Sequence, residues 1–336
     1  MRILYKTHWQ NAAKELPTEN NDYQLRTMTT VNVIQRLTHG IKRQLTFALA
    51  CTTMAVAFMA CAEEEITPSP DNRLVEFPQG NHDYDAEILA IYQKYGTQLL
   101  YKYNDAMFRW QVTDQLAYFS RPADESYIAQ AVSFIQHNCL DFYSEDSLKL
   151  YLPYRIYLAS DLGRLFEYSG QDITGANVNI KDTIWHTAAT NGYANICFGL
   201  ASRRLTTLSR DSLCLAKGEL NASMIAHAIS QGHISVPAAF IKEEVSGVSW
   251  SNYIGSYNIY GLLEYIDPKT IQPEQDFALF LKYLIAYTTE EFDNKFTTKS
   301  FDTSGRIARK ADIVREWMLQ EYNINLVDMA DTDIAF

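Results

Sequence analysis

The residues best placed to do chemistry lie in one segment, residues 219–240. Zinc hydrolases carry an HExxH motif on a helix, in which two His side chains bind the metal and the Glu acts as general base. Here the same frame reads Ser-Met-Ile-Ala-His, with Ser223 at the first His position, Met224 at the Glu position and His227 at the second His. Because a hydroxyl rarely ligates zinc and a thioether cannot take a proton, we expect a metal-site helix that has lost its chemistry. Taken alone, the segment leaves open that His227 is simply a core histidine.

The helix that positions these residues is indicated by the spacing of its apolar side chains. Apolar residues recur three or four positions apart, as on a helix with one buried face. They are Leu220, Met224, Ile225, Ala228 and Ile229. Gly232 and Pro237 mark the end of the helix. Glu219, at its start, is either an acid that supports the site or a solvated helix-start charge.

The rest of the chain predicts helices around a few short strands. Helices are expected at residues 85–95, 123–142, 144–150, 206–216, 272–287 and 307–322. Strands are expected at residues 99–103, 152–159 and 193–200, and a loop at residues 163–182. We find no internal repeat. The sequence therefore predicts one α+β domain over residues 83–336, with a small mixed sheet packed by helices.

A targeting segment precedes this domain. An apolar run of 16 residues, 45–60, follows basic residues and is too short to span a membrane. It ends in Phe-Met-Ala-Cys, which resembles a bacterial lipoprotein cleavage box, and the Glu triplet at 63–65 resembles the surface-export signal of Bacteroidetes lipoproteins. We expect a signal peptide at residues 28–60, a lipid on Cys61, a Pro-containing tether at 61–82 and a non-native extension at 1–27. An ordinary cleaved signal with an incidental Cys is the alternative.

Composition limits the partners. Residues 61–336 hold 22 Lys and Arg against 37 Asp and Glu, a net charge of −15, which argues against nucleic acid. The three Cys after Cys61 match no zinc ribbon, and we expect them to be small buried hydrophobes, although one disulfide is possible. The chain has 22 Tyr. One aromatic cluster could line a ligand groove or pack against the central helix: Trp250, Tyr253, Tyr257 and Tyr260.

Several segments, taken in order, resemble one known family. They are Ile-Tyr-Gln-Lys-Tyr-Gly-Thr-Gln-Leu-Leu-Tyr at 91–101, Leu-Pro-Tyr-Arg-Ile at 152–156, the 223–227 frame, Pro-Ala-Ala-Phe at 237–240, the segments at 261–265 and 310–317, Gln-Asp-Phe-Ala-Leu at 275–279 and Ile-Asn-Leu at 324–326. Together they are similar to the substrate import-associated zinc metallohydrolase lipoproteins of Bacteroidetes. The resemblance implies a zincin-like metallopeptidase domain, zinc as cofactor, and an outer-membrane nutrient importer as neighbour.

The residues that differ from this family are those that would bind zinc or act as the general base. Its Glu-Asp-Phe-Ala-Glu run has lost both Glu carboxylates and keeps only Asp276. His227 and Asp276 would supply two ligands, whereas catalytic zinc needs three and a base near the bound water. His233 would complete an altered triad with His227 and Asp276 or Glu274 if Gly232 turns the chain back. His186, beside Trp185, is a further stray candidate.

Three functions follow as hypotheses. The first is a cell-surface lipoprotein with a metallopeptidase-like fold and an inactive site, a pseudoenzyme that binds or assists in a nutrient-import system. The second is an active zinc-dependent metallohydrolase or peptidase with a rearranged site. The third is a purely structural lipoprotein scaffold whose old cleft is filled by core side chains.

Overall fold

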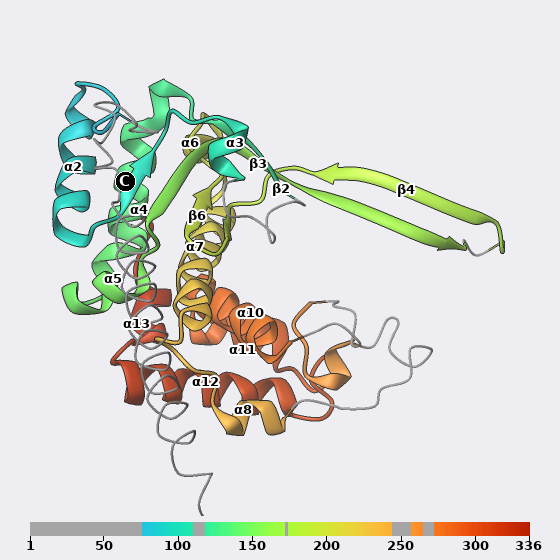
Figure 1. The fold of residues 1–336 in the computed structure, drawn as a ribbon. Helices are drawn as coiled ribbons and strands as arrows, with labels where there is room; N and C mark the ends of the chain where they lie inside the picture. Colours follow the sequence, from blue (N-terminus) through green and yellow to red (C-terminus); the bar gives the residue numbers. More distant parts are fainter. Residues whose placement is uncertain (1–75, 110–117, 172–173, 244–256, 265–271) are drawn as a thin grey trace, which may run out of the picture. The chain divides into compact units, whose positions relative to one another are not determined.

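The computed structural model describes residues 76–109, 118–171, 174–243, 257–264 and 272–336. Their helices and strands form a mixed α+β fold, as predicted (Figure 1). The 1–27 extension, the 28–60 signal peptide, Cys61 and most of the 61–82 tether lie outside the described residues. No helix among the described residues is long and apolar enough to cross a membrane.

The first half of the fold supplies the sheet and the helices next to it. Its elements are α2 (Asp83–Tyr95), β1 (Gln98–Leu100), α3 (Asp105–Phe108), β2 (Tyr118–Pro122), η1 (Glu125–Tyr127), α4 (Ile128–Asn138), η2 (Leu140–Phe142), α5 (Glu145–Tyr151), β3 (Arg155–Gln171), β4 (Asn177–Ile184), β5 (Ala189–Asn191) and β6 (Asn195–Phe198). The strand order is β1-β3-β6-β5, and β2 and β4 also pair with β3. β1 and β6 run parallel to β3, whereas β5 is antiparallel to β6 and lies at the edge.

The second half is helical. Its elements are α6 (Arg204–Thr207), α7 (Arg210–Ser230), α8 (Ala238–Lys242), η3 (Tyr257–Tyr260), α10 (Pro273–Ala286), α11 (Thr289–Phe296), α12 (Arg306–Tyr322) and α13 (Leu326–Asp331). α10 and α12 match their predicted ranges within a residue or so. α10 begins with Pro273 and two acids in its first turn, and α12 ends at Asn323 in the left-handed conformation.

The loop predicted at residues 163–182 is wrong. The second half of β3 pairs with β4 in a long antiparallel hairpin that projects from the rest of the fold (Figure 1). The register sets Glu167 opposite Lys181, and the two side chains form an ion pair at 2.6 Å. Ile180 and Ile184 are exposed. No residue of β4 is buried, so this strand shows no alternation of buried and exposed residues, and the Gly and Asn residues of the segment are typical of turns.

α7 joins residues 210–216 of the predicted 206–216 helix and the site helix into one continuous helix, whereas residues 206 and 207 belong to α6. Ser209 caps its first turn by accepting a hydrogen bond from the Ser212 backbone. Inside it, Gly218 lies so close to α10 that a Cβ there would overlap the carbonyl oxygen of Lys282. A glycine at this position therefore allows close packing of the two helices, although it interrupts the sequence pattern of a single helix.

Buried polar contacts fix α7 in place. The ammonium of Lys217, fully buried, donates to the carbonyls of Met329 at 2.7 Å and Thr332 at 2.9 Å, at the C-terminal end of α13. One turn later the Asn221 side chain donates to the carbonyl of Asn138 at 2.8 Å, which ties α7 to the end of α4. The two contacts attach α7 to α13 and to the end of α4, and so fix the position of the helix that carries the site residues.

Most core side chains gather in one cluster that joins α2, α4, the sheet, α7, α10 and α12. Its largest members include the fully buried Phe134, Phe198 and Phe280. Burying a side chain of this size is worth about 1.5–3 kcal/mol. The three Cys of the described residues are buried free thiols, as expected.

Candidate functional site

His227 lies near the C-terminal end of α7, with 5% of its surface exposed. Its Nδ1 is buried and has no hydrogen-bond partner among the described residues. Burial lowers the pKa of His227, opposed by a backbone contact at Gly192, while the charge on His233 adds a smaller lowering. The imidazole is therefore neutral at neutral pH, the form in which His binds a metal.

Ser223 lies one turn before His227 on α7 and is also buried. It offers a hydroxyl where the HExxH frame has an imidazole. The helix thus sets the expected spacing of two ligands but supplies only one nitrogen donor.

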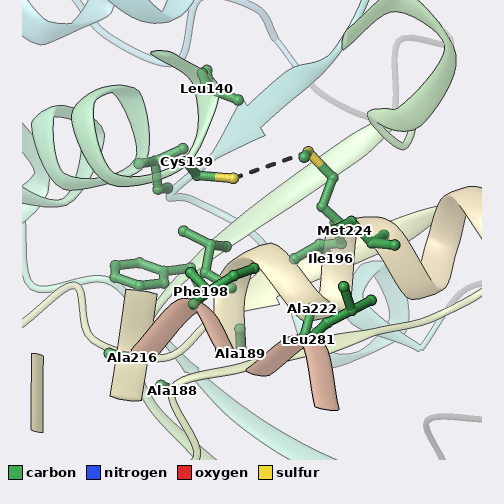
Figure 2. Close-up of a cluster of buried hydrophobic side chains, with 14 of the residues drawn as sticks. Cys139, Leu140, Ala188, Ala189, Ile196, Phe198, Ala216, Ala222, Met224 and Leu281 are labelled. Carbon is green, nitrogen blue, oxygen red and sulfur yellow. Dashed lines mark hydrogen bonds between the residues drawn. The ribbon is translucent and has the colours of Figure 1, made fainter. Parts of the chain in front are cut away.

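Met224 packs into the hydrophobic core. Its thioether sulfur lies 4.0 Å from the thiol of Cys139, just beyond α4. Figure 2 shows the Met224 side chain directed toward Cys139, above the apolar residues Ile196 and Phe198 of β6. Only 1% of Met224 is exposed. The position that holds the base in HExxH therefore serves packing in this chain.

Asp276, on α10, forms an ion pair with Lys310 of α12, and neither side chain is exposed. The Lys310 ammonium lies 4.6 Å from the ring centre of Phe240 and 5.4 Å from that of Phe280. Burial raises the pKa of Asp276, while the charge and hydrogen bond of Lys310 oppose the rise. The Lys310 ammonium therefore occupies the place at the Asp276 carboxylate that a metal ion would take.

Gly232 ends the α7 segment in the left-handed conformation, with φ of 76°, and His233 follows it. The backbone N–H of His233 donates to the carbonyl of Ala228 at 2.9 Å, which closes the turn as the sequence predicts. His233 is exposed, and so is Glu274 at the start of α10. Within the described ranges no group of three or more His, Cys, Asp or Glu side chains is arranged to hold a metal.

A charged cluster of Glu219, Glu264 and Lys282 lies beside α7, and no local sequence pattern predicts it. Glu264 accepts hydrogen bonds from Lys282 at 3.0 Å and from the Tyr283 hydroxyl at 2.5 Å. Burial raises the pKa of Glu219, opposed by the charge of Lys282 and by backbone contacts at Ala189 and Ala188. Glu219 is thus a desolvated acid facing β5, where a solvated helix-start charge was the simpler expectation. Lys282 and Tyr283 lie 18 and 19 residues from Glu264 along the chain, too far apart for a local sequence pattern to connect them.

His186 and the aromatic cluster lie elsewhere. His186 precedes β5 with φ of 79°, and its Nδ1 is 3.1 Å from Asp161, which also lies 3.8 Å from Arg204. Tyr257 and Tyr260 belong to η3, where the Tyr257 ring centre is 6.4 Å from that of Phe301. Trp250 and Tyr253 lie outside the described residues, so the predicted groove stays a prediction.

Comparison with known proteins gives one similarity in structure. No family model matches the chain, and no curated protein matches it. A protein from Bacteroides caccae ATCC 43185, called a "putative zinc-binding metallo-peptidase", superposes on 75% of this chain and 92% of its own at a TM-score of 0.46 and 13% identity. A similarity at this level does not extend to function or to a site.

A catalytic zinc does not fit the described side chains. Such an ion needs three protein ligands and a base near its bound water. His227 offers one nitrogen, Met224 belongs to the core and Asp276 is neutralised by Lys310. The described residues therefore support no zinc-dependent step.

Proposed function

We propose that this chain is a surface-exposed lipoprotein with a metallopeptidase-like fold, catalytically inactive, that acts as an accessory or binding component of an outer-membrane nutrient-import system. The observation that carries the inactivity is the burial of Met224 against Cys139 at the position of the general base. A side chain that fills the core cannot deliver a proton to a substrate.

Metal content and peptidase activity test this proposal together. The purified full-length chain, incubated with excess zinc and then desalted, is expected to retain well under one zinc per chain and to leave a mixed peptide library uncleaved. Stoichiometric zinc together with cleavage, both lost in His227→Ala, would refute it.

The unpartnered Nδ1 of His227 favours a second candidate, a metallohydrolase with a rearranged site. A buried polar atom without a partner is rare in native proteins and suggests a missing ion or water. In this case His233 would move in beside His227. Zinc binding that depends on both His227 and His233, measured as metal per chain in His227→Ala and His233→Ala, would support this second function and refute the first.

The membrane anchor is tested separately. Cys61 follows the predicted cleavage box, and its lipidation would hold the domain at the outer membrane. Cells expressing the full chain are expected to show it in the membrane fraction, with an acyl chain on the N-terminal peptide. Cys61→Ser should release it, whereas Cys51→Ser should not. Retention of the Cys61→Ser chain in the membrane would refute this anchor.

The role in import comes from the family resemblance. An accessory subunit should be isolated together with the importer after mild detergent extraction of the membrane. The same extraction from cells that express the Cys61→Ser chain serves as the control, because an unanchored chain should lose that association. Absence of any co-isolated outer-membrane transporter would argue for the scaffold hypothesis.

A further inference from the structure

Residues 332–336 follow α13 and belong to no helix or strand. Figure 1 places this end of the chain beside α2 and α4. The Asn138 side chain, at the end of α4, binds both main-chain groups of one residue in the segment. Its Nδ2 donates to the Ala335 carbonyl at 2.6 Å, and its Oδ1 accepts from the Ala335 N–H at 3.1 Å. Asn138 is only 1% exposed. A buried carboxamide placed in this way recognises a peptide backbone, not a particular side chain.

A second buried group holds the start of the segment. The Lys217 ammonium of α7 donates to the carbonyl of Thr332 at 2.9 Å. The side chains of the segment contribute less, because four of its five residues are exposed and only Ile334 is half-buried against the core. The segment is therefore held mainly through its backbone, a feature that every peptide shares. Because its release uncovers little apolar surface, it can open locally while the rest of the fold stays intact.

The segment leads to a cavity of about 760 Å³ between α2 and α4. Phe336 is one of the residues that line it, and the Phe336 ring centre lies 5.8 Å from that of Phe134. Ile91 of α2 and Val132 of α4 are buried and give the cavity apolar surface. Ligand sites in proteins have volumes of about 300–1,000 Å³. The backbone contacts at Asn138 thus adjoin a cavity that the segment lines without filling it.

We propose that Asn138 and the adjoining cavity form a peptide-binding site, which residues 333–336 occupy as a displaceable internal ligand. The partner is a peptide that repeats the pattern of this segment. It has an aliphatic residue at the Ile334 position, a residue bound by Asn138 through its backbone, and an aromatic residue at the cavity. The site is separate from His227, and it depends on neither the lipid anchor nor zinc.

A full-length variant with a weakened internal segment tests the proposal. Ile334→Asp removes the one side chain of the segment that packs against the core and leaves Asn138 in place. A labelled peptide, Thr-Asp-Ile-Ala-Phe, is titrated into each protein and followed by fluorescence polarisation. It is expected to bind Ile334→Asp with a Kd on the order of 0.1 mM. It should bind the wild type about tenfold more weakly, because the internal segment competes at an effective concentration of millimolar order. Ile180→Asp, the same change at an exposed Ile of β4, is the matched control and should behave like the wild type.

A modified peptide tests the role of Asn138 without altering the protein. N-methylation of the peptide's Ala keeps every side chain but removes the N–H that donates to Asn138 Oδ1. The methylated peptide should bind Ile334→Asp at least about tenfold more weakly, because it leaves a buried acceptor unpaired. Equal binding of the methylated peptide or of a scrambled one overturns the proposal. So does equal binding of the unmodified peptide to the wild type and to Ile334→Asp, or no binding to Ile334→Asp.

Hydrogen exchange on the unaltered chain gives an independent check. If the segment opens locally, the Ala335 amide, which donates to Asn138, should exchange at least about a hundredfold faster than the buried amides of α7. Exchange of Ala335 as slow as that of α7 would show that the segment is released only by global unfolding, and would overturn the proposal.

Discussion

Asp276 and Lys310, 34 positions apart in the sequence, form an ion pair that is fully buried between α10 and α12. Among the described residues, the ammonium has one further hydrogen-bond partner, the Gly261 carbonyl at 3.5 Å, and Oδ1 of Asp276 has none. With so few additional hydrogen bonds, the pair depends on the two opposite charges and on the contact of the ammonium with the rings of Phe240 and Phe280. The ammonium of Lys310 is what allows a carboxylate to lie fully buried at this position of α10.

Breaking this ion pair should destabilise the fold strongly. Asp276→Asn or Lys310→Met, made singly, should each cost about 3–5 kcal/mol, because each leaves one buried charge uncompensated. Unfolding in urea measures the loss. The double variant Asp276→Leu/Lys310→Met should lie within about 2 kcal/mol of the wild type. Additive losses in the double variant would contradict the coupling between the two residues.

Met224 should tolerate apolar but not charged replacement. Met224→Leu conserves volume and should cost less than about 1.5 kcal/mol. Met224→Glu would place a carboxylate against Cys139 and should cost more than about 3 kcal/mol or prevent folding. The midpoint of denaturant unfolding distinguishes the two. If Met224→Glu were as stable as the wild type, the position would have an open cavity in front of it and the core assignment would fail.

Gly218 should not accept a side chain. At an unconstrained helix position Gly→Ala stabilises by about 1 kcal/mol. Here the added Cβ would overlap the Lys282 carbonyl of α10, so Gly218→Ala should lower the free energy of unfolding, and Gly218→Ser should lower it further. Thermal melts of the three proteins give the order. A higher melting temperature for Gly218→Ala would show that α7 and α10 can separate at no cost.

His227 should make stability depend on pH. Burial lowers its pKa in the folded chain below the ordinary value of 6.5, so the unfolded chain binds a proton at a higher pH than the folded chain does. Stability from this group is complete above about pH 7.5 and falls as pH drops through the unfolded pKa toward the folded one. His227→Gln removes the contribution of this ring to stability, so the unfolding free energy of the variant should vary less than that of the wild type between about pH 7.5 and 5.5. Identical pH slopes in the two proteins would show that the ring is solvated.

Local sequence patterns predicted the elements that bury one face. The sequence indicates α12 through Ile313, Trp317 and Leu319, and α10 through Pro273 and the acids that mark a helix start. The range of α12 is confirmed, but its buried stripe is Ile307, Val314 and Met318, one position away from the expected residues, and Leu319 is exposed. The β3–β4 hairpin was missed because it has no buried face, and α13 because six residues hold too little periodicity. The site was harder still. That Lys310 neutralises Asp276, or that Glu219 is desolvated, depends on contacts between distant segments, which no local spacing records.

The hairpin of β3 and β4 has one further consequence, for solubility. Beyond Arg164, β3 pairs with β4 alone, and β4 has no partner on its other side within the described residues, so backbone N–H and C=O groups are left free along the projecting ribbon. An exposed strand edge of this kind can pair with a strand of another molecule. The neighbouring charges of Lys181 and Asp182, set in the middle of β4 between Ile180 and Ile184, oppose this stacking, because burying them in a growing sheet would be costly. Lys181 and Asp182 thus oppose self-association of the chain through the exposed edge of β4.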